Sequence, residues 1–170
     1  LNVVKYSEFN DFLNFGWSCY EGTYEIYHKH YEDVSKSSKL CKSNINNKKF
    51  KFVEPSIQYL HDSIINADYI YGNSITGGAL YKNSSSLWNN HYFFGDLVSS
   101  NIWFVDMKKK QKIGINLSYG EDLGLTSIVQ IDDKLLATSY MGMIYQINLP
   151  EKKIFDNLIY NKPFITKDIP

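Results

Sequence analysis

The chain has 170 residues, of which 44% are hydrophobic and 16% aromatic, so it can bury the core of one globular domain. Its 18 basic residues balance its 18 acidic residues, which argues against a nucleic-acid partner and against a general attraction to anionic lipid. Every basic residue is lysine, so the chain lacks the planar guanidinium that binds a carboxylate through two parallel hydrogen bonds.

The first residues of the chain, 1–4, have the composition of a strand. Because the sequence starts with leucine rather than methionine, we expect it to be part of a longer protein. No apolar run approaches the ~20 residues that are needed to cross a bilayer. The sequence therefore predicts no membrane span.

The next two segments differ in composition. Residues 14–22 form a predicted aromatic turn, and residues 23–55 are polar and rich in lysine, as in a long surface loop. The two cysteines, Cys19 and Cys41, lie here. If they are paired, they close a loop of about 23 residues, which stabilises the fold by roughly 3 kcal/mol through the entropy of the unfolded chain. The alternative is two unrelated free thiols.

From residue 74 onward, short apolar segments are separated by turns rich in Gly, Asn, Ser and Asp, as in a series of strands. The predicted strands are, in chain order, residues 75–81, 92–96, 102–107, 112–116, 127–131, 134–139 and 143–148. Apolar and polar residues alternate in 143–148, and no segment has a helical period of similar strength. The sequence therefore predicts an all-β fold built as an antiparallel meander.

The even spacing of these strands is typical of a β-propeller, in which one four-stranded blade takes about 40 to 45 residues. The chain is long enough for three to four blades at most, and the surface loop reduces that number. Since a closed propeller has at least four blades, we expect a partial β-propeller of two to three four-stranded antiparallel blades over residues 1–149. Residues 150–170 then form a further strand or a tail.

Six short motifs occur in an order that resembles one family of propellers. They are Asn14-Phe15-Gly16-Trp17, Cys19-Tyr20-Glu21-Gly22, the segment from Pro55 to His61, Ser74-Ile75-Thr76-Gly77-Gly78, Phe94-Gly95-Asp96 and Ile102-Trp103. With these motifs, most of residues 1–149 is similar to the soluble quinoprotein glucose and sorbosone dehydrogenase-like propellers, a family that includes the hedgehog-interacting proteins. The resemblance implies a six-bladed ring of which this chain is the C-terminal part.

The resemblance also implies a pyrroloquinoline quinone (PQQ) cofactor and Ca²⁺ on the ring axis, in a periplasmic or secreted protein. In such an enzyme, Ca²⁺ polarises the quinone, and a neutral histidine takes the proton of a sugar hydroxyl as hydride passes to the quinone. The family places that histidine further upstream, and His28, His30, His61 and His91 do not match it. Relatives with Cys-Tyr-Glu-Gly carry a second cysteine, which favours a disulfide between Cys19 and Cys41.

Three residues match cofactor contacts of the family. Lys82 corresponds to a cationic residue that faces the quinone, and Trp17 corresponds to a tryptophan beside the cofactor. The backbone oxygen of Phe15 is a candidate calcium ligand. From the residues alone, the alternatives are a solvated surface lysine at Lys82 and a packing anchor at Trp17.

The loop 97–101, with Ser99 and Asn101, matches a segment that lines the cofactor site. Relatives often carry Lys or Arg there, whereas this loop has no charge. Two hypotheses follow. In the first, the chain is part of a PQQ-dependent dehydrogenase that oxidises a sugar or another alcohol and requires the remaining blades of the full-length protein. In the second, it belongs to a non-catalytic extracellular propeller without the cofactor, which serves as a binding module.

Overall fold

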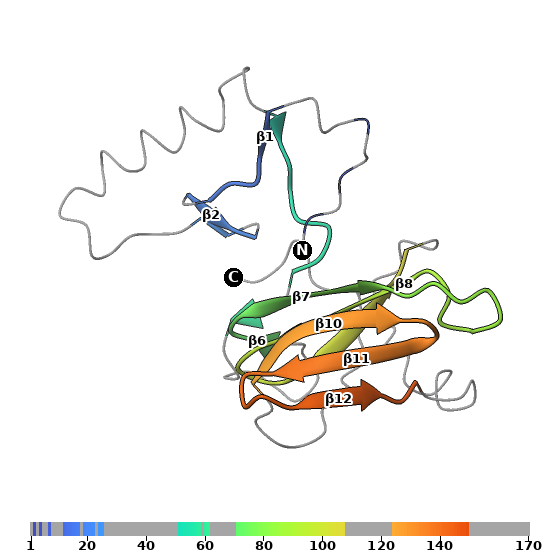
Figure 1. Ribbon diagram of the computed structural model, residues 1–170. Coiled ribbons are helices and arrows are strands. Elements are labelled where there is room, and N and C mark those ends of the chain that lie inside the picture. The colour runs from blue at the N-terminus through green and yellow to red at the C-terminus, as the bar shows by residue number, and fades with distance from the viewer. Residues whose placement is uncertain are drawn as a thin grey trace. The chain divides into compact units, whose positions relative to one another are not determined.

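The structure is a computed structural model (Figure 1). It describes residues 2, 4, 7, 12–17, 19–22, 24–25, 51–58, 60–61, 71–107 and 124–149. These residues form twelve strands and no α-helix, which confirms the predicted all-β class for this part of the chain. The chain divides into two compact units, residues 1–58 and 59–170, and each is described by itself.

The first unit contains two pairs of very short strands. β1 (Leu13–Asn14) pairs in parallel with β4 (Lys51–Phe52). β2 (Tyr20–Glu21) pairs antiparallel with β3 (Tyr24–Glu25). Two-residue pairs contribute few hydrogen bonds, so this unit has little regular structure among its described residues.

The turn between β1 and β2 is organised by Gly16. Its backbone N–H donates to Asn14 Oδ1 (2.9 Å), and its carbonyl accepts from the backbone N–H groups of Cys19 (2.8 Å) and Tyr20 (2.7 Å). Gly16 has a φ of 92°, which a residue with a Cβ rarely adopts. The aromatic turn predicted in this region is therefore present, and Gly16 is the residue that allows it.

The strand predicted at residues 1–4 is wrong at Asn2 and Val4, which have no regular secondary structure. β-propensity reflects packing against a neighbouring strand, and a short β-branched run does not supply that neighbour. Of the loop predicted at 23–55, parts near both ends are described, and they contain β3 and β4. The rest of this loop lies outside the described residues.

The second unit begins with β5 (Leu60–His61), which pairs in parallel with β6 (Tyr71–Gly72). Two antiparallel meanders follow, which we call the first sheet and the second sheet. The first sheet consists of β7 (Ile75–Leu80), β8 (His91–Asp96) and β9 (Ile102–Asp106). The second sheet consists of β10 (Leu125–Ile131), β11 (Lys134–Ser139) and β12 (Ile144–Ile147).

The ends of these six strands agree with the predicted ends to within two residues, and the antiparallel meander is confirmed. Each sheet has three described strands rather than four. The predicted fourth strand of the first sheet, 112–116, and the segment 150–170 lie outside the described residues. The four-stranded blade and the six-bladed ring therefore stay predictions.

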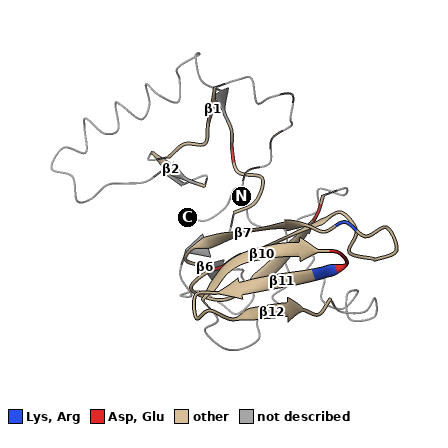
Figure 2. Cartoon of the chain, in the orientation of Figure 1, with Lys and Arg blue, Asp and Glu red and all other residues tan. Residues whose placement is uncertain are grey.

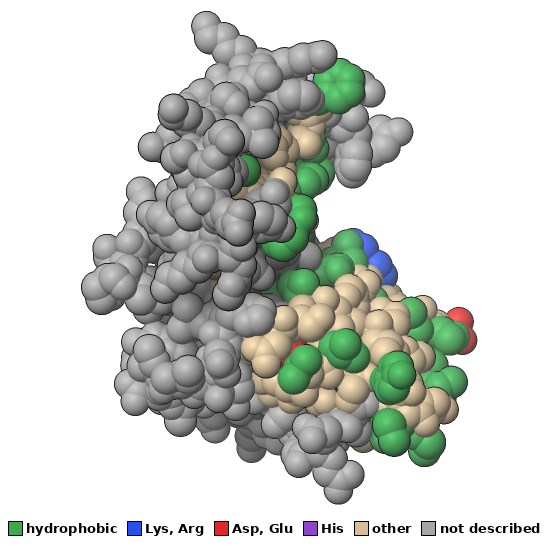
Figure 3. All heavy atoms as spheres, turned by 90° about the vertical axis from the view of Figure 1, so that its left-hand side faces the viewer, with side chains coloured by type: hydrophobic (Ala, Val, Ile, Leu, Met, Phe, Trp, Pro, Cys, Tyr) green, Lys and Arg blue, Asp and Glu red, His purple; other side chains and the backbone are tan. Residues whose placement is uncertain are grey.

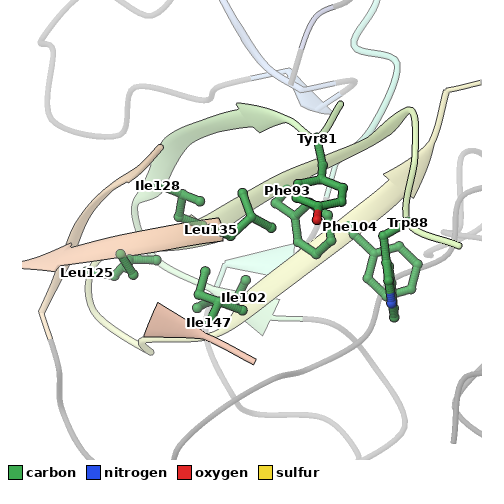
Figure 4. Packing of buried hydrophobic residues seen from close by; sticks show 10 residues of the cluster. Tyr81, Trp88, Phe93, Ile102, Phe104, Leu125, Ile128, Leu135 and Ile147 are labelled. Atoms are coloured by element: carbon green, nitrogen blue, oxygen red, sulfur yellow. The ribbon is translucent and has the colours of Figure 1, made fainter. Parts of the chain in front are cut away.

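The two sheets pack face to face around one hydrophobic core (Figure 4). The core residues are Tyr81, Trp88, Phe93, Ile102 and Phe104 from the first sheet and its β7–β8 loop, and Leu125, Ile128, Leu135, Ala137 and Ile147 from the second sheet. Phe93 and Phe104 are fully buried, and the Trp88 ring meets the Phe104 ring edge-on at a centroid distance of 4.5 Å. Burying one such aromatic side chain contributes roughly 1.5–3 kcal/mol to stability, so this core holds the two sheets together.

The first strands of the two sheets, β7 and β10, lie side by side and run in the same direction (Figure 1). Near their beginnings, Thr76 Oγ1 donates to the backbone oxygen of Leu125 (3.0 Å). Near their ends, the Tyr81 hydroxyl donates to the backbone oxygen of Asp133 (2.8 Å). Hydrogen bonds therefore join the sheets at both ends of this strand pair.

The Gly-Gly pair in β7 allows close packing of the backbone. The register between β7 and β8 shifts between Thr76 and Ala79, as in a β-bulge. A Cβ on Gly78 would lie 1.6 Å from the backbone oxygen of Phe93, whereas a Cβ on Gly77 would meet nothing within 4 Å. The register shift marks the bulge, and Gly78 is the position at which the two backbones approach each other closely.

Candidate functional site

Lys82 lies at the opposite end of the first sheet from Ser99 and Asn101. Leu80 pairs with Tyr92, so Lys82, two residues later, lies beside the start of β8. Ser99 and Asn101 follow the end of β8, in the turn to β9. A strand of six residues spans roughly 20 Å. The structure therefore does not bring these three candidate cofactor contacts together.

The loop 97–101 is organised by the fully buried side chain of Asp96. One carboxylate oxygen accepts from the backbone N–H groups of Val98 (3.0 Å) and Ser99 (2.7 Å), and the other accepts from Ser74 N–H (2.6 Å). The backbone N–H of Asp96 donates to the carbonyl of Asn101 (3.0 Å). These bonds hold the loop in one conformation and tie it to the start of β7.

The polar groups of the loop mostly serve its own structure. Ser99 Oγ accepts from the backbone N–H of Asn101 (3.4 Å). Ser100 has a φ of 55° and is buried, and its Oγ accepts from the backbone N–H of Gly124 (3.1 Å). Asn101 is also buried. Of the two candidate ligand contacts in this loop, the Ser99 hydroxyl already accepts a hydrogen bond and Asn101 is buried.

Lys82 is exposed and takes part in a small polar cluster. Its Nζ donates to Asn90 Oδ1 (2.6 Å). Its backbone N–H donates to Gln130 Oε1 (2.7 Å), and its carbonyl accepts from Gln130 Nε2 (2.9 Å). Gln130 thus binds the backbone of Lys82 as a neighbouring strand would, and it links the end of β7 to β10. This setting fits a solvated surface lysine, and the cofactor contact stays a prediction.

Trp17 and Phe15 belong to the other unit. Both are exposed, and 77% of the Trp17 surface is accessible. Within its own unit, Trp17 is therefore not a buried packing anchor, which was the structural alternative. The role of the Phe15 backbone oxygen as a calcium ligand stays a prediction, as does a cofactor contact by Trp17. Among the described residues, no group of three or more His, Cys, Asp or Glu is placed to hold a metal.

Cys19 is buried and takes part in a disulfide. Cys41 lies outside the described residues, so the pairing of Cys19 with Cys41 stays a prediction. His28 and His30 lie outside them as well. His91 is buried, and its ring contacts the rings of Trp88 and Phe104 at centroid distances of 5.5 and 5.4 Å. It is thus surrounded by the aromatic core.

Sequence reasoning missed a group of exposed apolar side chains at the turn from β11 to β12. We call this group the apolar tip, and it consists of Tyr140 (80% exposed), Met141 (74%), Met143 (53%) and Ile144 (69%). Hairpin turns usually carry Gly, Asn, Asp or Ser, and a Tyr-Met-Gly-Met-Ile run departs from that rule. This unusual turn sequence was the signal from which the exposed apolar group could have been predicted.

Hydrogen bonds hold the backbone of the apolar tip. Ser139 N–H donates to the carbonyl of Met143 (2.9 Å), and Tyr140 N–H donates to the carbonyl of Gly124 (2.7 Å). Met141 N–H donates to Ser139 Oγ (3.0 Å). Gly142, with a φ of 79°, provides the left-handed residue that reverses the chain. The exposed side chains are therefore presented on an ordered turn.

The sequence neighbours of the tip are uncharged. No Lys, Asp or Glu occurs from residue 135 to residue 149. In Figure 2, β12 and the turn before it carry neither blue nor red, and the charges of the second sheet lie at the other turn, between β10 and β11. Figure 3 shows exposed hydrophobic side chains on the surface of this unit, with few charged ones among them. Within residues 135–149, the tip is thus an apolar surface without charged side chains.

Comparison with protein-family models, curated proteins and solved structures finds no match to this chain. The resemblance to the quinoprotein propellers therefore stays a prediction. The described residues contain no helix that is both long and apolar enough to cross a membrane.

Proposed function

We propose that this chain is part of a β-propeller that acts as a non-catalytic, periplasmic or secreted binding module, and that its apolar tip contacts a protein partner. The observation that carries the proposal is the tip itself. Tyr140 and Met141 are largely exposed on a turn whose backbone is fixed by hydrogen bonds. Aromatic residues and methionine are enriched at protein interfaces, and a turn whose backbone is already ordered loses little backbone entropy when it binds.

The propeller part of the proposal is supported by the arrangement of the two sheets. Both are antiparallel meanders of consecutive strands, and they pack face to face. Their first strands, β7 and β10, are adjacent and run in the same direction. Neighbouring blades around a ring axis have this relation, because each blade repeats the previous one by a rotation.

The choice of a protein as partner follows from charge. The tip and its sequence neighbours, residues 135–149, contain no cation that would bind a phosphate, a carboxylate or an anionic lipid headgroup. Such a surface gains free energy only from burial of apolar area, at roughly 25 cal/mol per Å². An apolar pocket on another protein offers that burial together with a defined shape.

A quinone dehydrogenase is the second candidate, and one observation favours it. The Lys82 ammonium is exposed beside Asn90, so a cofactor carboxylate has access to it. The separation of Lys82 from Ser99 and Asn101 weighs against this candidate. PQQ has three carboxylates, and Lys82 alone compensates one of them.

Cofactor binding separates the two candidates. Full-length protein is titrated with PQQ at saturating Ca²⁺, followed by calorimetry and by dye reduction with an aldose. We expect neither quinone uptake nor sugar oxidation. Stoichiometric uptake that Lys82→Ala weakens by about 10- to 100-fold, the loss expected for one charge-assisted hydrogen bond, would favour the dehydrogenase instead.

The binding surface is tested by mapping the partner contact. A photo-cross-linking amino acid replaces Met141 in cells that make the protein, and the cross-linked protein is identified and purified. We expect direct binding that Tyr140→Ala and Met141→Ala each weaken by about 10-fold or more, as for interface hot spots. Lys134→Ala, at the other end of β11, is the matched control. Equal affinities of all four proteins, or cross-links to lipid alone, would contradict the proposal.

A further inference from the structure

The three methionines of the chain occupy two different environments. Met141 and Met143 flank Gly142 in the apolar tip and are 74% and 53% exposed. Met107 follows β9 and is only partly exposed, and its backbone N–H donates to the carbonyl of Asn90 (3.2 Å). The protein therefore contains two accessible thioethers next to each other and a third one as an internal reference.

We propose that Met141 and Met143 form a methionine-oxidation site for hydrogen peroxide, at which sulfoxide formation converts the apolar tip into a polar one. The sulfur lone pair attacks one peroxide oxygen, the O–O bond breaks, and water leaves. Sulfur loses two electrons and peroxide gains them. The product side chain carries a strong hydrogen-bond acceptor in place of an apolar thioether.

The structure explains why this modification changes the surface without unfolding the protein. Among the described residues, the hydrogen bonds that hold the turn come from backbone groups and from Ser139 Oγ, and none of them involves a methionine sulfur. The buried cluster that joins the two sheets contains neither Met141 nor Met143. Oxidation of these residues therefore leaves the core packing in place, whereas oxidation of a core methionine would disrupt it.

The accessibility of the tip predicts a ranking of oxidation rates. The protein is treated with limiting hydrogen peroxide, and sulfoxide at each methionine is followed by peptide mass mapping. We expect Met141 and Met143 to oxidise at least about 5-fold faster than Met107, because oxidation follows exposure. Oxidation of Met107 at the same rate, or protection of both tip methionines, would overturn the proposal.

Hydrophobic-interaction chromatography measures the change in surface polarity. Retention on a hydrophobic-interaction column falls after peroxide treatment, while the urea midpoint of unfolding stays unchanged. The double variant Met141→Leu with Met143→Leu keeps an apolar tip that cannot be oxidised, so its retention stays the same after peroxide. A similar fall in the wild type and in the double variant would contradict a role for these two residues.

The effect on partner binding rests on the proposed function, and the two failures are distinguishable. If peroxide oxidises the tip and lowers column retention but leaves the affinity of the identified partner unchanged, the binding role of the tip fails and the oxidation site stands. If the tip methionines are not oxidised first, the oxidation site fails whatever the partner does. We expect peroxide to weaken partner binding by about 10-fold in the wild type and not in the double leucine variant.

Discussion

The two sheets are built alike but are buried to different extents. In the first sheet, β9 is buried along its whole length, and β8 is buried at every position except Tyr92. In the second sheet, burial alternates along β11, β10 is buried only at Leu125 and Ile128, and three of the four residues of β12 are exposed. β8 and β9 therefore form the packed scaffold, whereas β7, with one buried residue of six, and the second sheet present side chains to solvent.

This difference predicts that removing an aromatic ring from the scaffold costs far more than trimming the exposed strand. Phe104→Ala removes a fully buried ring that contacts Trp88, Phe93 and His91. We expect a loss of about 4 kcal/mol in the free energy of unfolding. Ile144→Ala, on β12, should change it by less than about 0.5 kcal/mol.

Tryptophan fluorescence during urea unfolding measures these effects. Trp88 and Trp103 are buried in the second unit, whereas Trp17 is largely exposed, so the signal reports mainly on the two sheets. Equal midpoints for Phe104→Ala and Ile144→Ala would show that the difference in burial between the sheets has no energetic consequence.

The next largest difference in stability is expected between substitutions at Gly78 and at Gly77. Gly78→Ala would place a Cβ 1.6 Å from the backbone oxygen of Phe93, so β7 must move away from β8. We expect a loss of about 3 kcal/mol, as in overpacked cores. Gly77→Ala meets open space, and its effect should stay within about 1 kcal/mol. The same urea unfolding experiment measures both, and a larger loss at Gly77 would contradict the bulge geometry.

Asp96 is a buried turn carboxylate and Asp132 is an exposed one, so the effects of their substitution on stability can be compared. Asp96→Asn replaces one accepting oxygen by an NH₂ group, which then faces a backbone N–H of the loop 97–101 or of Ser74. We expect a loss of about 2 kcal/mol. Asp132→Asn, at the exposed β10–β11 turn with a φ of 54°, should be neutral because Asn tolerates this conformation. Thermal unfolding followed by circular dichroism distinguishes the two variants.

The smallest expected effect concerns the side-chain link between the sheets. Gln130→Ala removes both hydrogen bonds to the backbone of Lys82, and we expect a loss of about 1 kcal/mol because the site is exposed. Gln146→Ala removes one long bond to Asn148 (3.4 Å) and should have no measurable effect. If both variants unfold at the same urea concentration as the wild type, Gln130 does not stabilise the contact between the sheets.

The long strands were predictable from the sequence because their signals are local. Gly, Asn, Ser and Asp mark most of the turns, and the alternation of buried and more accessible residues in β11 follows from burial on one face. The parallel pairs β1–β4 and β5–β6 were not predicted, because a two-residue pair depends on contacts between distant segments and leaves no periodic pattern. The central role of Trp88 in the core was missed for the same reason, since its loop position gives no indication of burial.

The candidate site was less predictable than the fold. The motif matches identify Lys82, Ser99 and Asn101, but they do not show how far apart these residues lie in the sheet. Their separation follows from the strand register, in which Leu80 pairs with Tyr92. The burial of Asn101 likewise depends on the Asp96 carboxylate, which organises the loop. The apolar tip was visible as an unusual turn sequence, but its exposure follows from the position of β12 in the second sheet.

The order of the two meanders along the chain has a consequence for synthesis on the ribosome. The three described strands of the first sheet have emerged once Asp106 leaves the ribosome, but the residues that cover Phe93 and Phe104 belong in part to the later segment Leu125–Leu135. At a translation rate of roughly 5–20 residues per second, this aromatic surface stays exposed for a few seconds before the second sheet can cover it. During that interval the nascent chain offers a binding surface to chaperones, and a slower ribosome lengthens it.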